Sequence, residues 1–413
     1  YRNSNRDSAK FYYIKVDGFT DLNNENQETK ALSYINLSGI YEQDSIFDEA
    51  INYAEKAIEM QDENGKMPSG NNGPWNDNET PVRNTAHWCI AFFEAFENTG
   101  EDKFLEAGKK ASEYLLNDDL RPDDKTFECR TNPEKDRCNG LIGQAWIIEA
   151  LSKAYEVLEE ERYHDTAVEL FLEHPFDHAT GLWKTVEVNG EILGYDTTFN
   201  HQLWFAASGS LLEDERVEEQ VKRFVDRLES NFSIHDNGLV QHKLSAELGK
   251  KELLVALKKR KFDVINLKLR EAHRSWKKDV EKKETLMERA IGYHAFNMYG
   301  FALLYQSYEN HSFWETKAFK DADNAVSLDK YQSKIEENMY GYPYNPPGIE
   351  NAYALQAFGE DKKEIRKWLE KQFEKTFNFN TNLMEKNASD PETCSARIYE
   401  ASRLKNQKLE LNN

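Results

Sequence analysis

The sequence predicts an all-α protein built as a closed ring of six helical hairpins. Charged, amphipathic segments alternate with segments that are apolar nearly all round, and the spacing between successive pairs is irregular. Long connectors rich in Gly, Pro, Asn and aromatic residues precede most of the apolar segments. Because a helix that is apolar on every side must be covered on every side, the apolar members belong inside and the charged members outside.

The first hairpin shows the contrast between the two kinds of helix. Residues 45–60 place apolar side chains on one face and acids and lysine on the other, whereas residues 84–96 (NTAHWCIAFFEAF) are apolar nearly all round. The other pairs are 101–116 with 138–158, 161–174 with 194–208, 213–232 with 290–308, 313–331 with 346–359, and 362–377 with 390–404. The charged member of the fifth pair has the least regular pattern.

An open α-solenoid is the structural alternative to a ring. Solenoid repeats keep a period of about 34–47 residues, whereas the spacing here varies, so we favour the closed ring. The connectors 67–83, 121–137, 178–195 and 339–347 all precede inner helices and should emerge at one end of it. The third contains an Asn-Gly pair between alternating segments, which predicts a short β-hairpin.

Long loops at one end of a rigid scaffold are where binding sites tend to form. Trp75, Tyr340, Tyr342 and Tyr344 lie in these connectors. Aromatic side chains with Asn and Asp around a cleft suit sugar rings, whose C–H faces stack while their hydroxyl groups form hydrogen bonds. The alternative is that the aromatic side chains only pack the loops against the ring.

The predicted ring occupies residues 41–405, after an N-terminal extension (1–40) and before a C-terminal tail (406–413). A basic helical insertion is expected at about 235–289, where residues 250–283 hold thirteen Lys and Arg against five Asp and Glu. This segment is either a solvated helix face or a docking surface for an acidic partner.

Charge and composition exclude several classes of function. The net charge of −21 argues against nucleic acid as a partner. No apolar run is long enough for a membrane span, and no signal peptide is visible, so a cytoplasmic location is favoured. We expect no cofactor and no metal, since the chain has neither a phosphate-binding glycine loop nor a compact set of metal ligands. Pairing of Cys129 with Cys138 stays open.

Polar residues gather at the starts of the apolar helices. His87, His201 and His294 occupy comparable places there, and Asn84, Asn139, Gln144, Asp196 and Asn297 accompany them. In a closed ring all of these would face the same mouth. For Asp196, which directly precedes a helix, the alternative role is an N-cap.

Two stretches resemble a known family. DTTFNHQLWFAAS (196–208) is similar to the helix opening that carries the catalytic Asp of unsaturated glucuronyl and rhamnogalacturonyl hydrolases, and IGQAWIIEAL (142–151) is similar to their Gly-Gln-Ala-Trp helix. The two helices occur here in the opposite order. The six hairpins resemble the (α/α)6 toroid of the six-hairpin glycosidase superfamily. The resemblance implies that Asp196 is the general acid/base, which protonates the vinyl ether of an unsaturated uronic acid.

The leading prediction is a carbohydrate-active enzyme, a glycoside hydrolase that acts on a uronic-acid-containing saccharide by acid/base catalysis. Its predicted catalytic residues are Asp196, His201 and His294. The predicted substrate-binding residues are His87, Asn139, Gln144, Trp75, Asn84, Tyr293, Tyr340, Tyr342 and Tyr344.

Three alternatives remain open. A sugar epimerase or isomerase would use paired histidines, as N-acylglucosamine 2-epimerases do on a similar ring. A polysaccharide lyase would use Tyr293 and Asn139. A non-catalytic helical scaffold would only bind a glycan or peptide.

Overall fold

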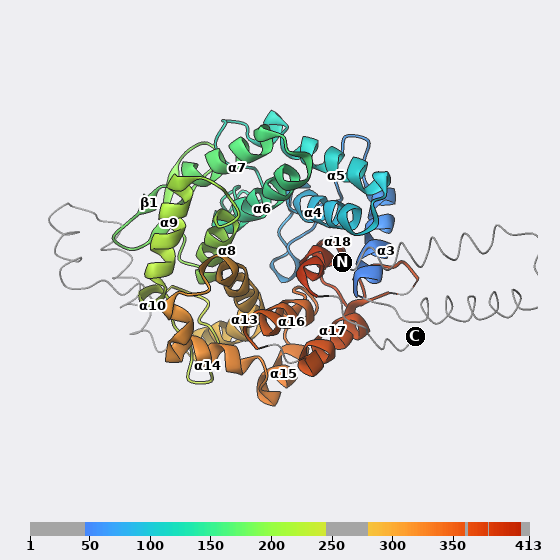
Figure 1. The fold of residues 1–413 in the computed structure, drawn as a ribbon. Helices are drawn as coiled ribbons and strands as arrows, with labels where there is room; N and C mark the ends of the chain where they lie inside the picture. Colours follow the sequence, from blue (N-terminus) through green and yellow to red (C-terminus); the bar gives the residue numbers. More distant parts are fainter. Residues whose placement is uncertain (1–45, 245–279, 360–361, 379, 406–413) are drawn as a thin grey trace, which may run out of the picture.

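The computed structural model describes residues 46–244, 280–359, 362–378 and 380–405. In this part of the chain, two concentric layers of helices form a ring (Figure 1). The outer layer contains α3 (Ile46–Met60), α5 (Asp102–Leu115), α7 (Glu161–Glu173), α9 (Glu215–Asp226), α10 (Leu228–Asn231), α14 (Lys317–Ala325), α15 (Asp329–Glu336) and α17 (Lys362–Thr376).

The inner layer contains α4 (Val82–Thr99), α6 (Gly140–Leu158), α8 (Phe199–Gly209), α13 (Val280–Tyr308), α16 (Pro347–Phe358) and α18 (Pro391–Ala396), which continues as the 3-10 helix η4 (Arg397–Arg403). Three short 3-10 helices lie in connectors: η1 (Gly73–Trp75), η2 (Asp118–Leu120) and η3 (Ser312–Glu315). The predicted alternation of outer and inner helices is therefore confirmed.

The inner helices close on themselves. Each packs against the next, from α4 to α6, α8, α13 and α16, and the last inner segment, α18 with η4, returns to α4. This contact between the first and the last inner segments of the described chain excludes the open solenoid. The apolar core includes Trp88, Trp204 and Tyr353, which are almost fully buried, and the last two pack on Tyr299 of the inner helix α13.

A small antiparallel sheet lies beside the ring. Strands β1 (Phe176–Asp177), β2 (Leu182–Val186) and β3 (Ile192–Tyr195) are arranged in the order β1-β2-β3. The predicted β-hairpin is thus present, with one additional strand. It lies in the connector before α8 and leads the chain toward Asp196.

Three helices differ from the expected segments. The fifth outer helix is divided into α14 and α15, and the last inner segment is divided into α18 and η4. The fourth inner helix, α13, begins at Val280, ten residues before the predicted start.

Three further predictions concern the terminal and inserted segments, the cysteines and membrane spans. The N-terminal extension, the C-terminal tail and residues 245–279 of the basic insertion lie outside the described residues. All four cysteines are free, Cys129 and Cys138 included. Among the described helices, none is both long and apolar enough to cross a membrane.

Candidate functional site

A cavity of about 240 Å³ opens at one end of the ring, where the connectors meet the first turns of the inner helices. Connectors and helix starts from five of the six hairpins contribute to its wall. The lining residues are Asn72, Trp75, Arg83, Arg130, Lys135, Asn139, Ile142, Trp146, Thr198, Asn200, His201, His242, Lys243, Arg289, Tyr293, Phe296, Tyr344 and Asn345.

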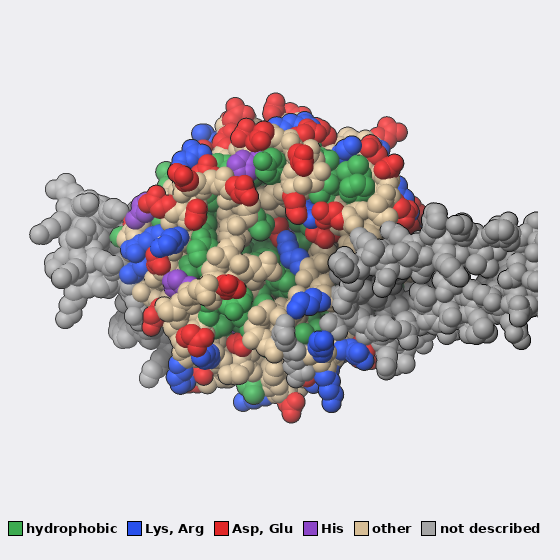
Figure 2. All heavy atoms as spheres, in the orientation of Figure 1, with side chains coloured by type: hydrophobic (Ala, Val, Ile, Leu, Met, Phe, Trp, Pro, Cys, Tyr) green, Lys and Arg blue, Asp and Glu red, His purple; other side chains and the backbone are tan. Residues whose placement is uncertain are grey.

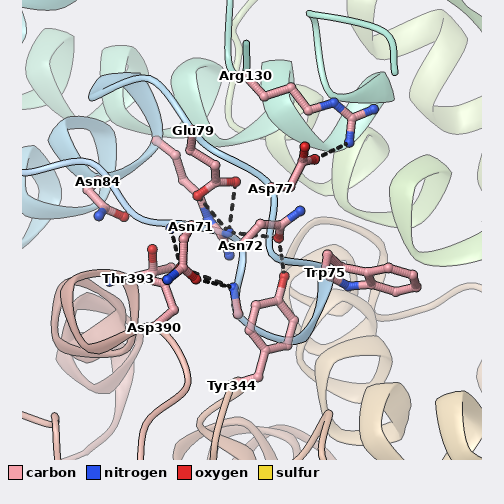
Figure 3. A network of polar contacts seen from close by, with 12 residues as sticks. Asn71, Asn72, Trp75, Asp77, Glu79, Asn84, Arg130, Tyr344, Asp390 and Thr393 are labelled. Carbon is pink, nitrogen blue, oxygen red and sulfur yellow. Dashed lines mark hydrogen bonds and ion pairs between the residues drawn. The ribbon is translucent and has the colours of Figure 1, made fainter. Parts of the chain in front are cut away.

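The connector before α4 is anchored to the residue that precedes α18 (Figure 3). The Asp390 carboxylate accepts hydrogen bonds from the backbone N–H groups of Asn71, at 3.0 Å, and Gly73, at 3.3 Å. The hydroxyl group of Tyr344 donates to Asn72 Oδ1 at 2.6 Å. These bonds across the closure of the ring hold Asn72 and Trp75 at the cavity.

A histidine and a largely buried aspartate side chain form a dyad just before and within the first turn of α8. Nδ1 of His201 lies 2.7 Å from Oδ2 of Asp196, and the backbone N–H groups of Thr198 and Leu141 donate to the two carboxylate oxygens at 3.0 and 3.2 Å. Burial alone would raise the pKa of Asp196, but His201 and the two N–H donors outweigh it and hold the pKa well below its usual value. Asp196 is therefore an ionised carboxylate. Because such a group can only accept hydrogen bonds, Nδ1 of His201 is the donor.

This arrangement fixes what His201 presents to the cavity. With the Nδ1 proton directed at Asp196, the neutral ring leaves the lone pair of Nε2 free to accept a proton. The expectation that Asp196 caps the helix is wrong, because the N-cap residue of α8 is Thr198. Asp196 stands two residues before the cap and does not itself line the cavity.

The backbone at the start of α6 makes room for the dyad. Asn139 and Gly140 both have left-handed conformations, with φ of 56° and 60°. A Cβ atom on Gly140 would lie 2.6 Å from Asp196 Oδ2 and 3.0 Å from His201 Nδ1. Only glycine allows so close an approach without displacing the dyad.

The substitution Gly140→Ala should therefore lower the rate of any reaction that uses the dyad by at least about tenfold, because it shifts the reacting groups. Gly100→Ala is the matched control, since Gly100 has φ of 70° and open space around its Cβ position. Both variants should lose about 1 kcal/mol of unfolding free energy through backbone strain. Steady-state rates and thermal unfolding of both proteins test this, and equal activity in the two variants would contradict it.

A second histidine enters the cavity from the neighbouring backbone segment. The N–H of Phe199 donates to the carbonyl oxygen of His242 at 3.0 Å, and Thr198 pairs with Lys243 in an antiparallel bridge. His242 thus lies beside the start of α8, and its Nδ1 atom is buried without a hydrogen bond. Burial, together with the cations around it, holds the pKa of His242 well below its usual value, so its ring is neutral.

The wall of the cavity is cationic although the chain is strongly acidic. Arg83, Arg130, Lys135, Lys243 and Arg289 line it, and of the residues that the structure describes no Asp or Glu does. Figure 2 shows acidic side chains crowded around the periphery of the ring. The cavity is therefore suited to an anionic ligand, which the surface as a whole would repel.

Three of these cations have buried or half-buried acidic partners behind the wall. Arg83 contacts Glu79 at 3.2 Å, and both Arg130 and Lys135 contact Asp77, at 3.1 and 3.0 Å. Burial raises the pKa of Glu79 to about 7, against the opposing charge of Arg83. The guanidinium group of Arg83 also lies 4.0 Å from the centre of the Trp146 ring, which fixes its position.

The predicted site residues divide into three groups. His201, Asn139, Trp75, Tyr293 and Tyr344 line the cavity. Asp196, His87 and Tyr340 lie just behind it, in contact with lining residues. His294, Gln144, Asn84 and Tyr342 do not reach it.

The side chains of the third group have structural contacts elsewhere. His294 is bonded through Nδ1 to the N–H of Val240 and through Nε2 to the carbonyl oxygen of Ala322, so neither ring nitrogen is free. Gln144 holds the connector before α6 by bonding the backbone of Phe127 and Cys138. Asn84 donates to the carbonyl oxygen of Pro68, and Tyr342 is buried with the ammonium group of Lys375, on α17, 5.9 Å from its ring centre. Of the histidines that the epimerase alternative could pair, His294 is therefore not available at the cavity.

Sequence reasoning missed His242 and the five cations. One signal was available, because Arg83, Arg130 and Lys135 stand in or next to the connectors of a very acidic chain. The group Glu161, His164 and Asp165 could offer three metal ligands, but it lies on the outer helix α7 and not at the cavity.

Comparison with known proteins gives one close relative and several similar folds. No family model matches the chain. The archaeal glycosylation protein Q of Haloferax volcanii is 39% identical over 371 residues, which cover 89% of this chain and 99% of that protein.

Two solved structures of low sequence identity have a similar architecture. Cellobiose 2-epimerase from Bacillus thermoamylovorans has a TM-score of 0.56 at 12% identity, with 86% of this chain and 98% of that chain covered. An unsaturated glucuronyl hydrolase specific for heparin has a TM-score of 0.53 at 11% identity, with 87% and 95% covered. The predicted (α/α)6 toroid of the six-hairpin glycosidases is confirmed at the level of the fold.

Proposed function

The chain belongs to the family of the archaeal glycosylation protein Q, and from this premise we propose that it is a carbohydrate-active enzyme that moves a proton on a uronic-acid-containing saccharide, as an epimerase or isomerase. The name of the relative refers to glycosylation, which agrees with a saccharide substrate. The observation that carries the proposal is a cavity with two histidines, one of them bonded to a carboxylate, in a cationic wall.

Epimerisation and isomerisation of sugars require removal and return of a proton at carbon. His201 is suited to remove it, because Asp196 orients the ring and stabilises the imidazolium that forms when Nε2 accepts the proton. The imidazolium of His201 can return the proton to carbon, and the neutral His242, which lines the same cavity, can serve as a second base. Trp75 and Trp146 also line the cavity, with Arg289 and Arg83 held over their rings.

The cationic wall supports the uronic acid part of the proposal. A uronate carries one negative charge per sugar unit, and a wall with five Lys and Arg attracts it. A neutral hexose would gain no such charge–charge attraction from the wall.

Glycoside hydrolysis becomes the second candidate. Most glycosidases use a pair of carboxyl groups, whereas the described wall of the cavity has none and Asp196 is ionised. One observation favours a hydrolase nonetheless: a protonated His201, stabilised by Asp196, can itself protonate the vinyl ether of an unsaturated uronic acid. For a lyase, burial raises the pKa of Tyr293 well above 10, which makes the phenol a poor base.

Incubation of the protein with uronic-acid-containing saccharides in D2O separates these reactions. An epimerase or isomerase exchanges a ring-carbon proton for deuterium without change in covalent connectivity, as NMR and mass spectrometry detect. Loss of the vinyl-ether absorbance of unsaturated disaccharides indicates the hydrolase, and gain of that absorbance from saturated polymer indicates a lyase. If the folded protein catalyses none of these changes but binds the saccharides, the proposal is overturned in favour of a binding scaffold.

A further inference from the structure

We propose that Arg289 binds the carboxylate of the substrate and makes the enzyme select uronates over neutral hexoses. This inference rests on the proposed function, because it specifies how the same cavity distinguishes its substrate. It concerns binding, and it can therefore be tested apart from catalysis.

Arg289 differs from the other cations of the wall in its partners. Arg83, Arg130 and Lys135 have ion pairs with acids behind the wall, and Lys243 donates to Thr198 Oγ1 at 2.8 Å. Within the described parts of the chain, Arg289 has neither an ion pair nor a hydrogen bond, and its Nε atom is buried without a partner. Its charge is therefore available to a ligand.

The position of Arg289 is nonetheless fixed. Arg289, Tyr293 and Phe296 are separated by four and three residues on α13, so they share one face of the helix, and all three line the cavity. The guanidinium group lies over the ring of Trp75, 4.7 Å from its centre. Because a cation held over an aromatic face loses little conformational freedom on binding, this arrangement prepares Arg289 for a ligand.

The Trp75 ring is itself held in place. Its Nε1 atom donates to the hydroxyl group of Tyr293 at 3.0 Å, and the ring packs on Tyr340 at 5.5 Å between centres. The connector that carries Trp75 is anchored by Asp390, as Figure 3 shows. Arg289 is thus positioned through Trp75, whose connector is bonded to Asp390 where the last inner segment meets the first.

Arginine is matched to a carboxylate by shape as well as charge. Its planar group offers parallel N–H donors to the two oxygens. Arg289 also lies close enough to contribute to the lowered pKa of His242, after burial, Lys243 and His201. Arg289, His201 and His242 line the same cavity, so a carboxylate bound by Arg289 would share it with the histidines that move the proton. A phosphate has the same attraction to arginine, so the test must separate the two anions.

The test compares binding of glucuronate, glucose and glucose 6-phosphate by isothermal titration calorimetry. The wild-type protein should bind glucuronate at least about tenfold more tightly than glucose. Arg289→Gln should remove this preference while leaving the affinity for glucose unchanged, and Arg289→Lys should retain part of it. Arg216→Gln is the control, because Arg216 is an exposed arginine on α9, and the preference should survive it.

Two outcomes would overturn the inference: an unchanged preference for glucuronate in Arg289→Gln, or tighter binding of glucose 6-phosphate than of glucuronate by the wild-type protein. Repeating the titrations with His201→Ala separates binding from catalysis. Selective binding that depends on Arg289 without proton exchange in the wild-type protein would overturn the proposed function alone. Proton exchange with a preference that does not depend on Arg289 would overturn this inference alone.

Discussion

Replacing Asp196 by asparagine is expected to lower kcat by a factor on the order of 10³ to 10⁴ while the protein remains folded. Asparagine can turn its amide N–H group toward His201 Nδ1. The neutral ring then carries its proton on Nε2, the atom that should accept the proton of the substrate. Substrate affinity should change little, because Asp196 does not line the cavity.

The matched control for this substitution is Asp214→Asn. Asp214 also accepts two backbone N–H bonds at the start of a helix, from Arg216 and Val217, but no histidine is bonded to it. The substitution Asp214→Asn should lower the unfolding free energy slightly and leave kcat unchanged. Deuterium exchange on the saccharide, with circular dichroism to verify folding, measures both effects. Wild-type exchange by a folded Asp196→Asn protein would remove the dyad from the mechanism.

Most of the ring could be predicted from the sequence because each layer imposes its own pattern. Outer helices such as α7 must alternate between core and solvent, and inner helices such as α6 must be apolar on all sides. The pattern did not reveal the division between α14 and α15. Each has only a short buried face, and a helix of this length leaves little periodicity to detect.

The histidines show why the site was harder to predict than the fold. His201 and His294 have similar apolar surroundings in the sequence, but α13 begins at Val280, which places His294 several turns from the start of its helix. Its ring points toward the outer layer, where Ala322 accepts its hydrogen bond. The face of the helix therefore decides which side chain reaches the cavity, since Tyr293 and Phe296 of the same helix line it. A helix that is apolar nearly all round does not show in its sequence which face turns toward the cavity.

The positions of the cavity's cations and of the Asp196 carboxylate depend on contacts between segments far apart in the sequence. Arg289 lies over Trp75, and Leu141 donates to Asp196 across 55 positions of sequence. No local pattern signals such contacts. The left-handed backbone conformation of Gly140, which allows the contact between Leu141 and Asp196, also cannot be predicted from the sequence alone.

Replacing Arg397 by methionine is expected to lower the unfolding free energy by about 3–5 kcal/mol, the cost of leaving buried charges without their partner. Arg397 is buried beneath the cavity, where its Nε atom donates to Glu400 at 2.8 Å and its Nη2 atom contacts Glu350. Its Nη1 atom donates to Asn345, which lines the cavity. Without the guanidinium group, two buried acids would share a site with no cation between them.

The loss should depend on pH in a defined direction. Burial raises the pKa of Glu350 to about 8 and also raises that of Glu400, while Arg397 opposes both shifts. An acid whose pKa is higher in the folded than in the unfolded protein stabilises the fold fully below its unfolded pKa, about 4.3. That contribution is lost as the pH rises through the folded pKa. In Arg397→Met both acids should be neutral near about pH 5 and unfavourably charged near about pH 9, so the destabilisation should be smaller at the lower pH.

Urea unfolding at several pH values measures this dependence. Adding Glu350→Gln and Glu400→Gln to Arg397→Met should recover part of the lost stability and remove most of its pH dependence, because amides need no counter-charge. Arg216→Met, which breaks an exposed pair with Asp214, is the matched control and should have little effect. The prediction would be contradicted if Arg397→Met were no more destabilising than Arg216→Met at any pH. In that case the buried cluster of Arg397, Glu350 and Glu400 would not stabilise the ring. Asn345 would then be positioned only by its bonds to Gly292 and Tyr340.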